Sequence, residues 1–66
     1  MQFALSLYQL RISHALTLTD VSKYTGISVP SLSAYERGHY TPSLENLCKL
    51  ANFFQVSLDQ LVGRVF

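Results

Sequence analysis

The fold is decided by residues 17–38, which read Thr17-Leu18-Thr19-Asp20-Val21-Ser22-Lys23-Tyr24-Thr25-Gly26-Ile27-Ser28-Val29-Pro30-Ser31-Leu32-Ser33-Ala34-Tyr35-Glu36-Arg37-Gly38. Thr17 and Ser28 are hydroxyl residues of the kind that accept a hydrogen bond from a free backbone N–H in the first turn of a helix. Gly26 and Gly38 suit the left-handed backbone conformation that often ends a helix. The segment therefore predicts two short helices joined by a tight turn, at about 18–25 and 29–36.

Three further helices are predicted outside this segment. Ser43 and Ser57 stand where helix N-caps belong, and Ser57 with Gln60 matches a capping box. Gly63 marks the end of the last helix. The expected spans are about 2–13, 44–54 and 58–62.

Apolar residues recur with the helical spacing of three and four, and no alternation typical of a strand is sustained. The sequence therefore predicts an all-α fold. The expected core consists of Phe3, Leu7, Leu10, Val21, Ile27, Leu32, Tyr35, Leu44, Leu47, Leu50, Ala51, Phe54, Val56, Leu58 and Leu61.

The composition indicates one small domain. With 66 residues, 48% of them hydrophobic, residues 1–66 are expected to fold as a unit that ends in a tail at 63–66. The net charge of +1 is not the basic excess of a strong nucleic-acid binder. No apolar run reaches the roughly 20 residues of a membrane span, and no cationic leader precedes the first apolar stretch. We expect a soluble, cytoplasmic protein.

The patterns of catalysis and metal binding are missing from the sequence. Cys48, His14 and His39 are too few for a tetrahedral zinc site, and Cys48 falls mid-helix, where a small buried residue is expected. Neither a glycine-rich phosphate loop nor a Ser-His-Asp set is visible. We therefore expect a binding protein, without metal or small-molecule cofactor, and not an enzyme.

Two short helices joined across Gly26 have the layout of a helix-turn-helix unit. Over about residues 3–62, the sequence resembles the phage-repressor (Cro/XRE-type) family of helix-turn-helix DNA-binding domains. The resemblance rests on Leu10-Arg11, Leu16-Thr17, Val21, Gly26-Ile27-Ser28, Leu32-Ser33-x-Tyr35-Glu36-Arg37-Gly38, Pro42-Ser43-Leu44-Glu45, Leu50-Ala51 and Val56-Ser57-Leu58-Asp59-x-Leu61.

The resemblance implies a compact five-helix, lambda-repressor-like domain whose helix-turn-helix unit covers about 18–36. It implies that the helix at 29–36 enters the major groove of double-stranded DNA, and that a dimer regulates transcription from operator DNA in a bacterial or phage-infected cell. It also implies an ion pair between Arg11 and Glu36. The sequence favours this pair independently, because each charged residue directly follows an expected core residue; two unrelated surface charges are the alternative.

The surface expected to contact bases is poor in the side chains that read them. Arg, Lys, Asn and Gln make paired hydrogen bonds to base edges, whereas Leu18 stands where the family often has glutamine. Serine discriminates poorly between bases, and small apolar side chains contact the thymine methyl group. We therefore expect readout of shape and of A·T-rich sequence by Val29, Pro30, Ser31, Ser33 and Ala34.

The sequence offers more groups that can contact the sugar-phosphate backbone than groups that can read bases. Helix N-termini have free N–H groups for phosphates, and the family contacts the DNA backbone with the loop after the reading helix. The expected contacts are Thr17, Thr19, Lys23, Ser28, Arg37, His39, Tyr40 and Ser43. Ser28 and Ser43 have the alternative role of N-caps alone. Tyr40 could instead pack over Pro42, and Arg37 could be a solvated loop charge. So few ionic contacts give weak binding by one chain, which favours a dimer.

A second apolar stripe is formed by Leu5, Tyr8 and Ile12, on the side of helix 2–13 away from Leu7. Surplus apolar residues of this kind usually mark a partner surface. The expected dimer or partner surface comprises Leu5, Tyr8, Ile12, Leu58, Val62, Val65 and Phe66. In the alternative, Tyr8 and Ile12 pack against the tail. The rival function is a protein-interaction module or antitoxin-type partner that kept the fold but reads DNA weakly.

Overall fold

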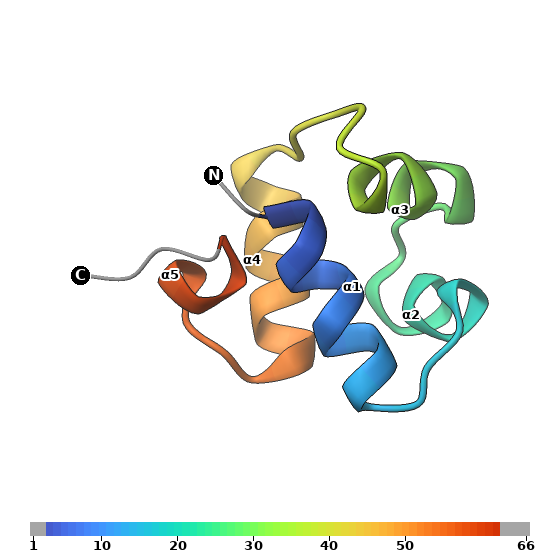
Figure 1. The fold of residues 1–66 in the computed structure, drawn as a ribbon, viewed down its shortest axis with the longest axis horizontal. Coiled ribbons are helices and arrows are strands. Elements are labelled where there is room, and N and C mark those ends of the chain that lie inside the picture. Colours follow the sequence, from blue (N-terminus) through green and yellow to red (C-terminus); the bar gives the residue numbers. More distant parts are fainter. Residues whose placement is uncertain (1–2, 63–66) are drawn as a thin grey trace.

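The computed structural model describes residues 3–62, whose path is shown in Figure 1. Its helices are α1 (Phe3–Ser13), α2 (Leu18–Thr25), α3 (Val29–Glu36), α4 (Leu44–Phe54) and α5 (Leu58–Leu61), and residues 3–62 contain no strand. The all-α, five-helix prediction is confirmed, with bounds that agree within one residue. Residue 2 and the expected stop at Gly63 lie outside the described range.

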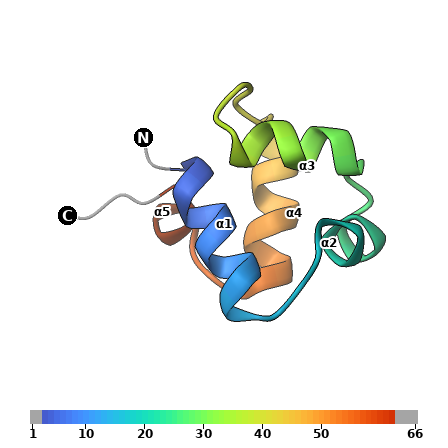
Figure 2. The same ribbon diagram turned by 45° about the vertical axis from the view of Figure 1, so that its right-hand side comes forward.

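Helices α1 and α4 run through the middle of the molecule, with α5 at one end and the α2–α3 pair at the other (Figures 1 and 2). Helix α3 packs on α1 and on α2, and α2 also packs on α4. Helix α5 packs on both α1 and α4. The described part measures 32 × 23 × 20 Å, and α3 lies at its edge.

The core draws on every helix and on the turn between α2 and α3. Burying one large aliphatic or aromatic side chain stabilises the fold by roughly 1.5–3 kcal/mol. Three residues of the predicted core, Leu10, Leu47 and Val56, are only partly buried and pack against it. The buried apolar residues are Phe3, Leu7, Val21, Ile27, Leu32, Tyr35, Leu50, Ala51, Phe54 and Leu61.

Two residues of the predicted core are exposed. Leu44 is 68% exposed and Leu58 is 39% exposed, so the core prediction is wrong for both. Each is the first residue of its helix, and each lies at the end of an apolar stripe. The spacing of a stripe does not show where the neighbouring helices stop covering it, and these first turns remain in solvent.

Local side-chain bonds begin the helices as the sequence predicts. The Thr17 N–H donates to the Asp20 carboxylate at 2.9 Å, while the Asp20 N–H donates to the Thr17 hydroxyl at 3.0 Å. Ser57 and Gln60 form the second capping box, through two bonds of 3.1 Å. The N-cap bonds lie within four consecutive residues, so the starts of these helices can be predicted from the local sequence.

Within residues 3–62, left-handed backbone occurs at four positions, each just beyond the end of a helix. Gly26 (φ 77°) and Gly38 (φ 75°) adopt it where glycine is expected, but Ala15 (φ 55°) and Gln55 (φ 56°) adopt it as well. After each non-glycine position, the next N–H donates to a carbonyl oxygen five residues back, at 3.0 Å. These bonds partly offset the cost of left-handed backbone at a non-glycine residue, which is roughly 1–2 kcal/mol per residue.

Replacing Gly26 by alanine isolates the energy of the left-handed conformation, because a Cβ there meets no other group within 4 Å. We expect Gly26→Ala to lower the free energy of unfolding by about 1 kcal/mol. The converse change, Ala15→Gly, relieves the same strain and should raise that free energy by up to about 1 kcal/mol. Chemical denaturation measures both, and a destabilised Ala15→Gly variant would contradict this account.

The capping box at the start of α2 makes a pH-dependent contribution to stability. Hydrogen bonds from Thr17 hold the pKa of Asp20 below its usual value. The box therefore stabilises the fold above the unfolded pKa of about 3.9, and this contribution is lost as the pH falls through the lower folded pKa. Asp20→Asn should flatten the acid limb of a plot of unfolding free energy against pH; an unchanged acid limb would refute the assignment.

Candidate nucleic-acid interface

The α2–α3 unit is held together by its turn. Ile27, in the turn, is buried in the core, and Gly26 provides the left-handed residue that reverses the chain. The Thr25 hydroxyl donates to the Val21 carbonyl at 2.8 Å and accepts from the Ile27 N–H at 3.3 Å. The buried Ile27 side chain and the Thr25 hydroxyl bonds thus hold the turn against α2, and they fix the orientation of α3 relative to α2.

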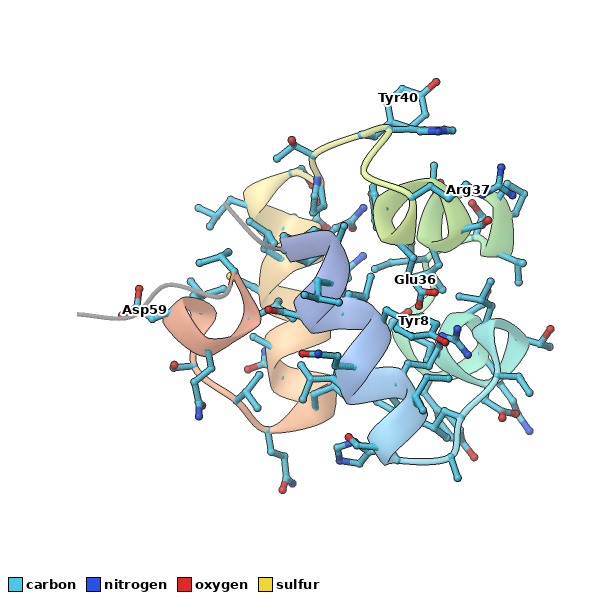
Figure 3. The ribbon with its side chains drawn as sticks, in the orientation of Figure 1. Tyr8, Glu36, Arg37, Tyr40 and Asp59 are labelled. Carbon is cyan, nitrogen blue, oxygen red and sulfur yellow. The ribbon has the colours of Figure 1, made fainter. Side chains whose placement is uncertain are left out.

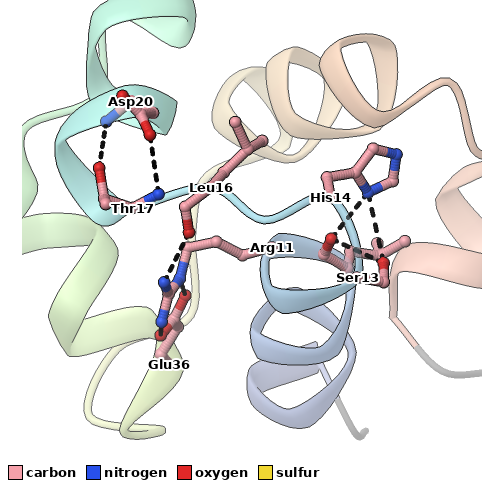
Figure 4. A network of polar contacts seen from close by, with 8 residues as sticks. Arg11, Ser13, His14, Leu16, Thr17, Asp20 and Glu36 are labelled. Atoms are coloured by element: carbon pink, nitrogen blue, oxygen red, sulfur yellow. Dashed lines mark hydrogen bonds and ion pairs between the residues drawn. The ribbon is translucent and has the colours of Figure 1, made fainter.

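The far end of α3 is tied to α1 by an ion pair between Arg11 and Glu36 (Figure 4). The Arg11 Nε and Nη2 atoms donate to the two carboxylate oxygens of Glu36, at 2.6 and 3.0 Å. Arg11 Nη1 also donates to the Leu16 carbonyl, at 2.9 Å. This three-bond arrangement, the Arg11 clasp, joins α1, the α1–α2 loop and the end of α3.

The Arg11 clasp is shielded from solvent on most sides. The Arg11 and Glu36 side chains are only 14% and 10% exposed, and the Tyr8 ring lies 5.4 Å from the guanidinium carbon. The bond to Glu36 raises the pKa of Arg11 above its usual range, so the guanidinium stays charged at every physiological pH. Planar, two-bond pairing of this kind fixes orientation as well as distance.

Tyr35 holds α3 from a second side. Its ring meets the Phe3 ring edge-on, with centroids 6.0 Å apart, and its hydroxyl accepts a hydrogen bond from the Asn46 amide at 3.1 Å. The role of Asn46 could not be predicted from the sequence, because its partner Tyr35 lies on another helix and leaves no local signal. Helix α3 is therefore supported by both α1 and α4.

The residues expected to read bases lie in and around the first turns of α3. Pro30 is exposed, whereas Val29, Ser31, Ser33 and Ala34 are half-buried. The five residues therefore offer less accessible surface than five fully exposed side chains would. The Ser28 hydroxyl caps the helix by accepting from the Ser31 N–H at 3.3 Å. The two hydroxyls are also bonded to each other at 2.8 Å. This face carries no charged side chain between residues 28 and 34.

The residues expected to contact phosphates are more widely spread. Thr17 is exposed at the N-cap of α2, and Thr19 and Lys23 are exposed on that helix. Ser43 caps α4 by accepting from the Asn46 N–H at 3.2 Å. Arg37, His39 and Tyr40 are exposed after α3, and Tyr40, 69% exposed, projects from the loop (Figure 3). Leu18 is half-buried against the core, which explains an apolar residue at this point of α2.

The residues expected at a partner surface fall into three groups. Leu5, Tyr8 and Ile12 are each about half exposed on α1. On α5, Leu58 is exposed, and Val62 just beyond it is half-buried. Val65 and Phe66 lie outside the described residues, as does the tail in the alternative packing.

Residues 3–62 contain no cluster of three potential metal-ligating side chains. Within the same range, none of the helices is sufficiently long and apolar to span a bilayer.

Comparison with known proteins identifies the family. A model of helix-turn-helix domains matches residues 7–61. The chain belongs to the Cro/C1/XRE-type helix-turn-helix family. This family consists of transcriptional regulators and is not enzymatic, in agreement with the sequence analysis.

The curated relatives include regulators from bacteria and archaea. The chain is 40% identical over 48 residues to the cryptic phage CTXphi transcriptional repressor RstR of Vibrio cholerae, covering 73% of this chain and 43% of that protein. It is 39% identical over 51 residues to an uncharacterised HTH-type transcriptional regulator of Methanocaldococcus jannaschii, covering 77% of each. The chain thus spans less than half of the phage repressor that it matches.

Two solved structures have the same fold. A transcriptional regulator from Listeria innocua matches with a TM-score of 0.89 and 32% identity, over 98% of this chain and 61% of that one. The restriction-modification controller protein C.AhdI from Aeromonas hydrophila matches with a TM-score of 0.85 and 27% identity, over 91% of each chain.

Removing one partner of the Arg11 clasp should destabilise the fold strongly, because Glu36 and the Leu16 carbonyl would both lose their donor. We expect Arg11→Ala to lower the free energy of unfolding by about 3 kcal/mol. The exposed pair Lys49–Glu45, 3.5 Å long, provides the control, and Glu45→Ala should cost less than about 0.5 kcal/mol. Equal losses in the two variants, measured by denaturation, would show that the clasp is no stronger than a surface pair.

Proposed function

We propose that this chain is a transcriptional regulator that binds operator sequences in double-stranded DNA as a homodimer. The observation that supports this most is the placement of α3, which is held at both ends while its first turn remains at the surface. The comparisons add support, because the family to which the chain belongs consists of transcriptional regulators. The proposed setting is the cytoplasm of a bacterial or phage-infected cell.

In this proposal α3 enters the major groove with Pro30 and Ala34 toward the bases. Small apolar side chains contact thymine methyl groups, and the Ser31 hydroxyl can bond to several base edges. Because the first turns of α3 carry no charged group, little base discrimination comes from paired hydrogen bonds. The preferred site is therefore A·T-rich, with part of its specificity arising from DNA shape.

Phosphate contacts supply most of the affinity. Arg37 and His39 follow α3 directly, and the N-termini of α2 and α3 offer backbone N–H groups to phosphates. Two or three ionic contacts give a shallow dependence of affinity on salt, about −0.9 in log–log terms for each contact. One copy then binds weakly, and two copies on half-sites about 34 Å apart bind far more tightly.

Arg37→Ala tests the phosphate contact. We expect weaker binding to every duplex, and a salt slope that is shallower by about 0.9, because one ionic contact is lost. Lys49→Ala removes the same charge from α4, beside Tyr24 and Phe53, and should change neither quantity. Fluorescence anisotropy at several salt concentrations measures both; an effect of equal size in the two variants would refute a specific contact by Arg37.

Selection from random duplexes tests the function as a whole. The wild-type chain should enrich an A·T-rich motif that contains two half-sites, and Ser31→Ala should alter the preference within each half-site. The uncharged outer face of α3 favours a second candidate, an interaction module or antitoxin-type partner that keeps the fold with weak DNA reading. Enrichment of no motif at low salt would support that candidate and refute the regulator proposal.

A further inference from the structure

The outer side of α1 carries large apolar side chains that nothing in residues 3–62 covers fully. Leu5 is 53% exposed, Tyr8 is 47% exposed and Ile12 is 50% exposed. Their spacing of three and four places them on one side of the helix, opposite the buried Phe3 and Leu7. These three residues are named the α1 face below.

The α1 face is free of uncompensated charge. Arg11 is the one charged residue of α1, and Glu36 neutralises it in the clasp. By contrast, α2 exposes Lys23, α4 exposes Glu45 and Lys49, and α5 exposes Asp59. In a contact related by a two-fold axis, a face meets its own copy, so a charged face would repel itself. Because the α1 face has no uncompensated charge, two copies of it do not repel each other electrostatically.

One exposed polar residue beside the α1 face can pair with its own copy. Gln9 is exposed between Tyr8 and Ile12, and its amide both donates and accepts hydrogen bonds. Two copies of such an amide can pair across a two-fold axis through two hydrogen bonds, in which each amide donates one N–H and accepts one. An uncharged amide of this kind fits a second copy better than a partner with a charged surface.

The size of the α1 face sets the strength of the contact. Three half-exposed side chains of this kind expose on the order of 300 Å² of mainly apolar surface, the size of the largest patch on many monomers. A stable interface typically buries about 800 Å² from each partner. A pair formed through this face therefore associates weakly in solution, and binding of both copies to one duplex holds it together.

We propose that the α1 face pairs with the same face of a second copy of this chain. The proposal rests on the function proposed above, for which it specifies the dimer contact. It also links this contact to α3, because the centre of the Tyr8 ring that a second copy would cover lies 5.4 Å from the Arg11 guanidinium carbon. Pairing would thus exclude water from the clasp that positions the end of α3.

Sedimentation equilibrium from micromolar to millimolar concentrations tests the contact without DNA. The wild-type chain should shift from monomer to dimer, and Ile12→Glu should remain a monomer throughout. Leu5→Glu is the second variant, so that a folding defect in one of them does not decide the result. Leu58→Glu tests the other part of the expected partner surface, since Leu58 is exposed on α5 outside the α1 face, and it should associate as the wild type does.

Two outcomes would overturn the proposal: a wild-type chain that stays monomeric at millimolar concentration, or loss of association in Leu58→Glu but not in the two α1 variants. Association of the α1 variants with wild-type strength would have the same meaning.

DNA binding separates this proposal from the proposed function. On a duplex with one half-site, Ile12→Glu should bind with wild-type affinity, and on a duplex with two half-sites it should bind about 100-fold more weakly than the wild type. If the wild-type chain binds neither duplex but still dimerises through the α1 face, the proposed function fails and the contact stands. If the wild type binds both duplexes and Ile12→Glu loses nothing on two half-sites, the contact fails and the function stands.

Discussion

The Arg11 clasp is the interaction on which the placement of α3 depends. One guanidinium satisfies the Glu36 carboxylate and the Leu16 carbonyl, and so binds the end of α3 to α1 and to the loop that leads into α2. The Glu36 side chain is only 10% exposed, so loss of the arginine would leave a carboxylate that water reaches poorly. A helix of eight residues is too short to be stable alone, and tertiary anchoring of this kind keeps it helical.

The outer surface of the first turns of α3 carries no charged side chain. The acidic residues of α2 and α3 are committed to structure, Glu36 to the clasp and Asp20 to the cap of α2. What remains at the surface of the first turns is a proline, small side chains and hydroxyls. Such a surface allows close approach to a groove but supplies few directed hydrogen bonds. In the proposed function, DNA shape therefore contributes most of the discrimination, and contacts to the DNA backbone contribute affinity.

The two sides of α1 have different roles: one side packs in the core, and the other is the proposed contact with a second copy. Phe3 and Leu7 build the core, while the α1 face leaves its apolar groups in solvent at a cost that association can offset. Tyr8 belongs to both sides, because its ring contacts the clasp and is half exposed. Through Tyr8, the α1 face therefore adjoins the clasp that holds the end of α3.

The sequence by itself determined the five helices and most of the core, because a cap such as Thr17–Asp20 forms within four residues and helical spacing sorts buried from exposed positions. The tertiary structure alone decided that Leu44 and Leu58 are left in solvent, since exposure depends on where neighbouring helices end. It also decided that Ala15 and Gln55 take left-handed backbone, and that Asn46 supports Tyr35. The exposure of Leu44 and Leu58 and the bond of Asn46 depend on contacts between different helices, which local spacing and composition do not encode. The left-handed residues form local bonds, but neither is a glycine that would mark the conformation in the sequence.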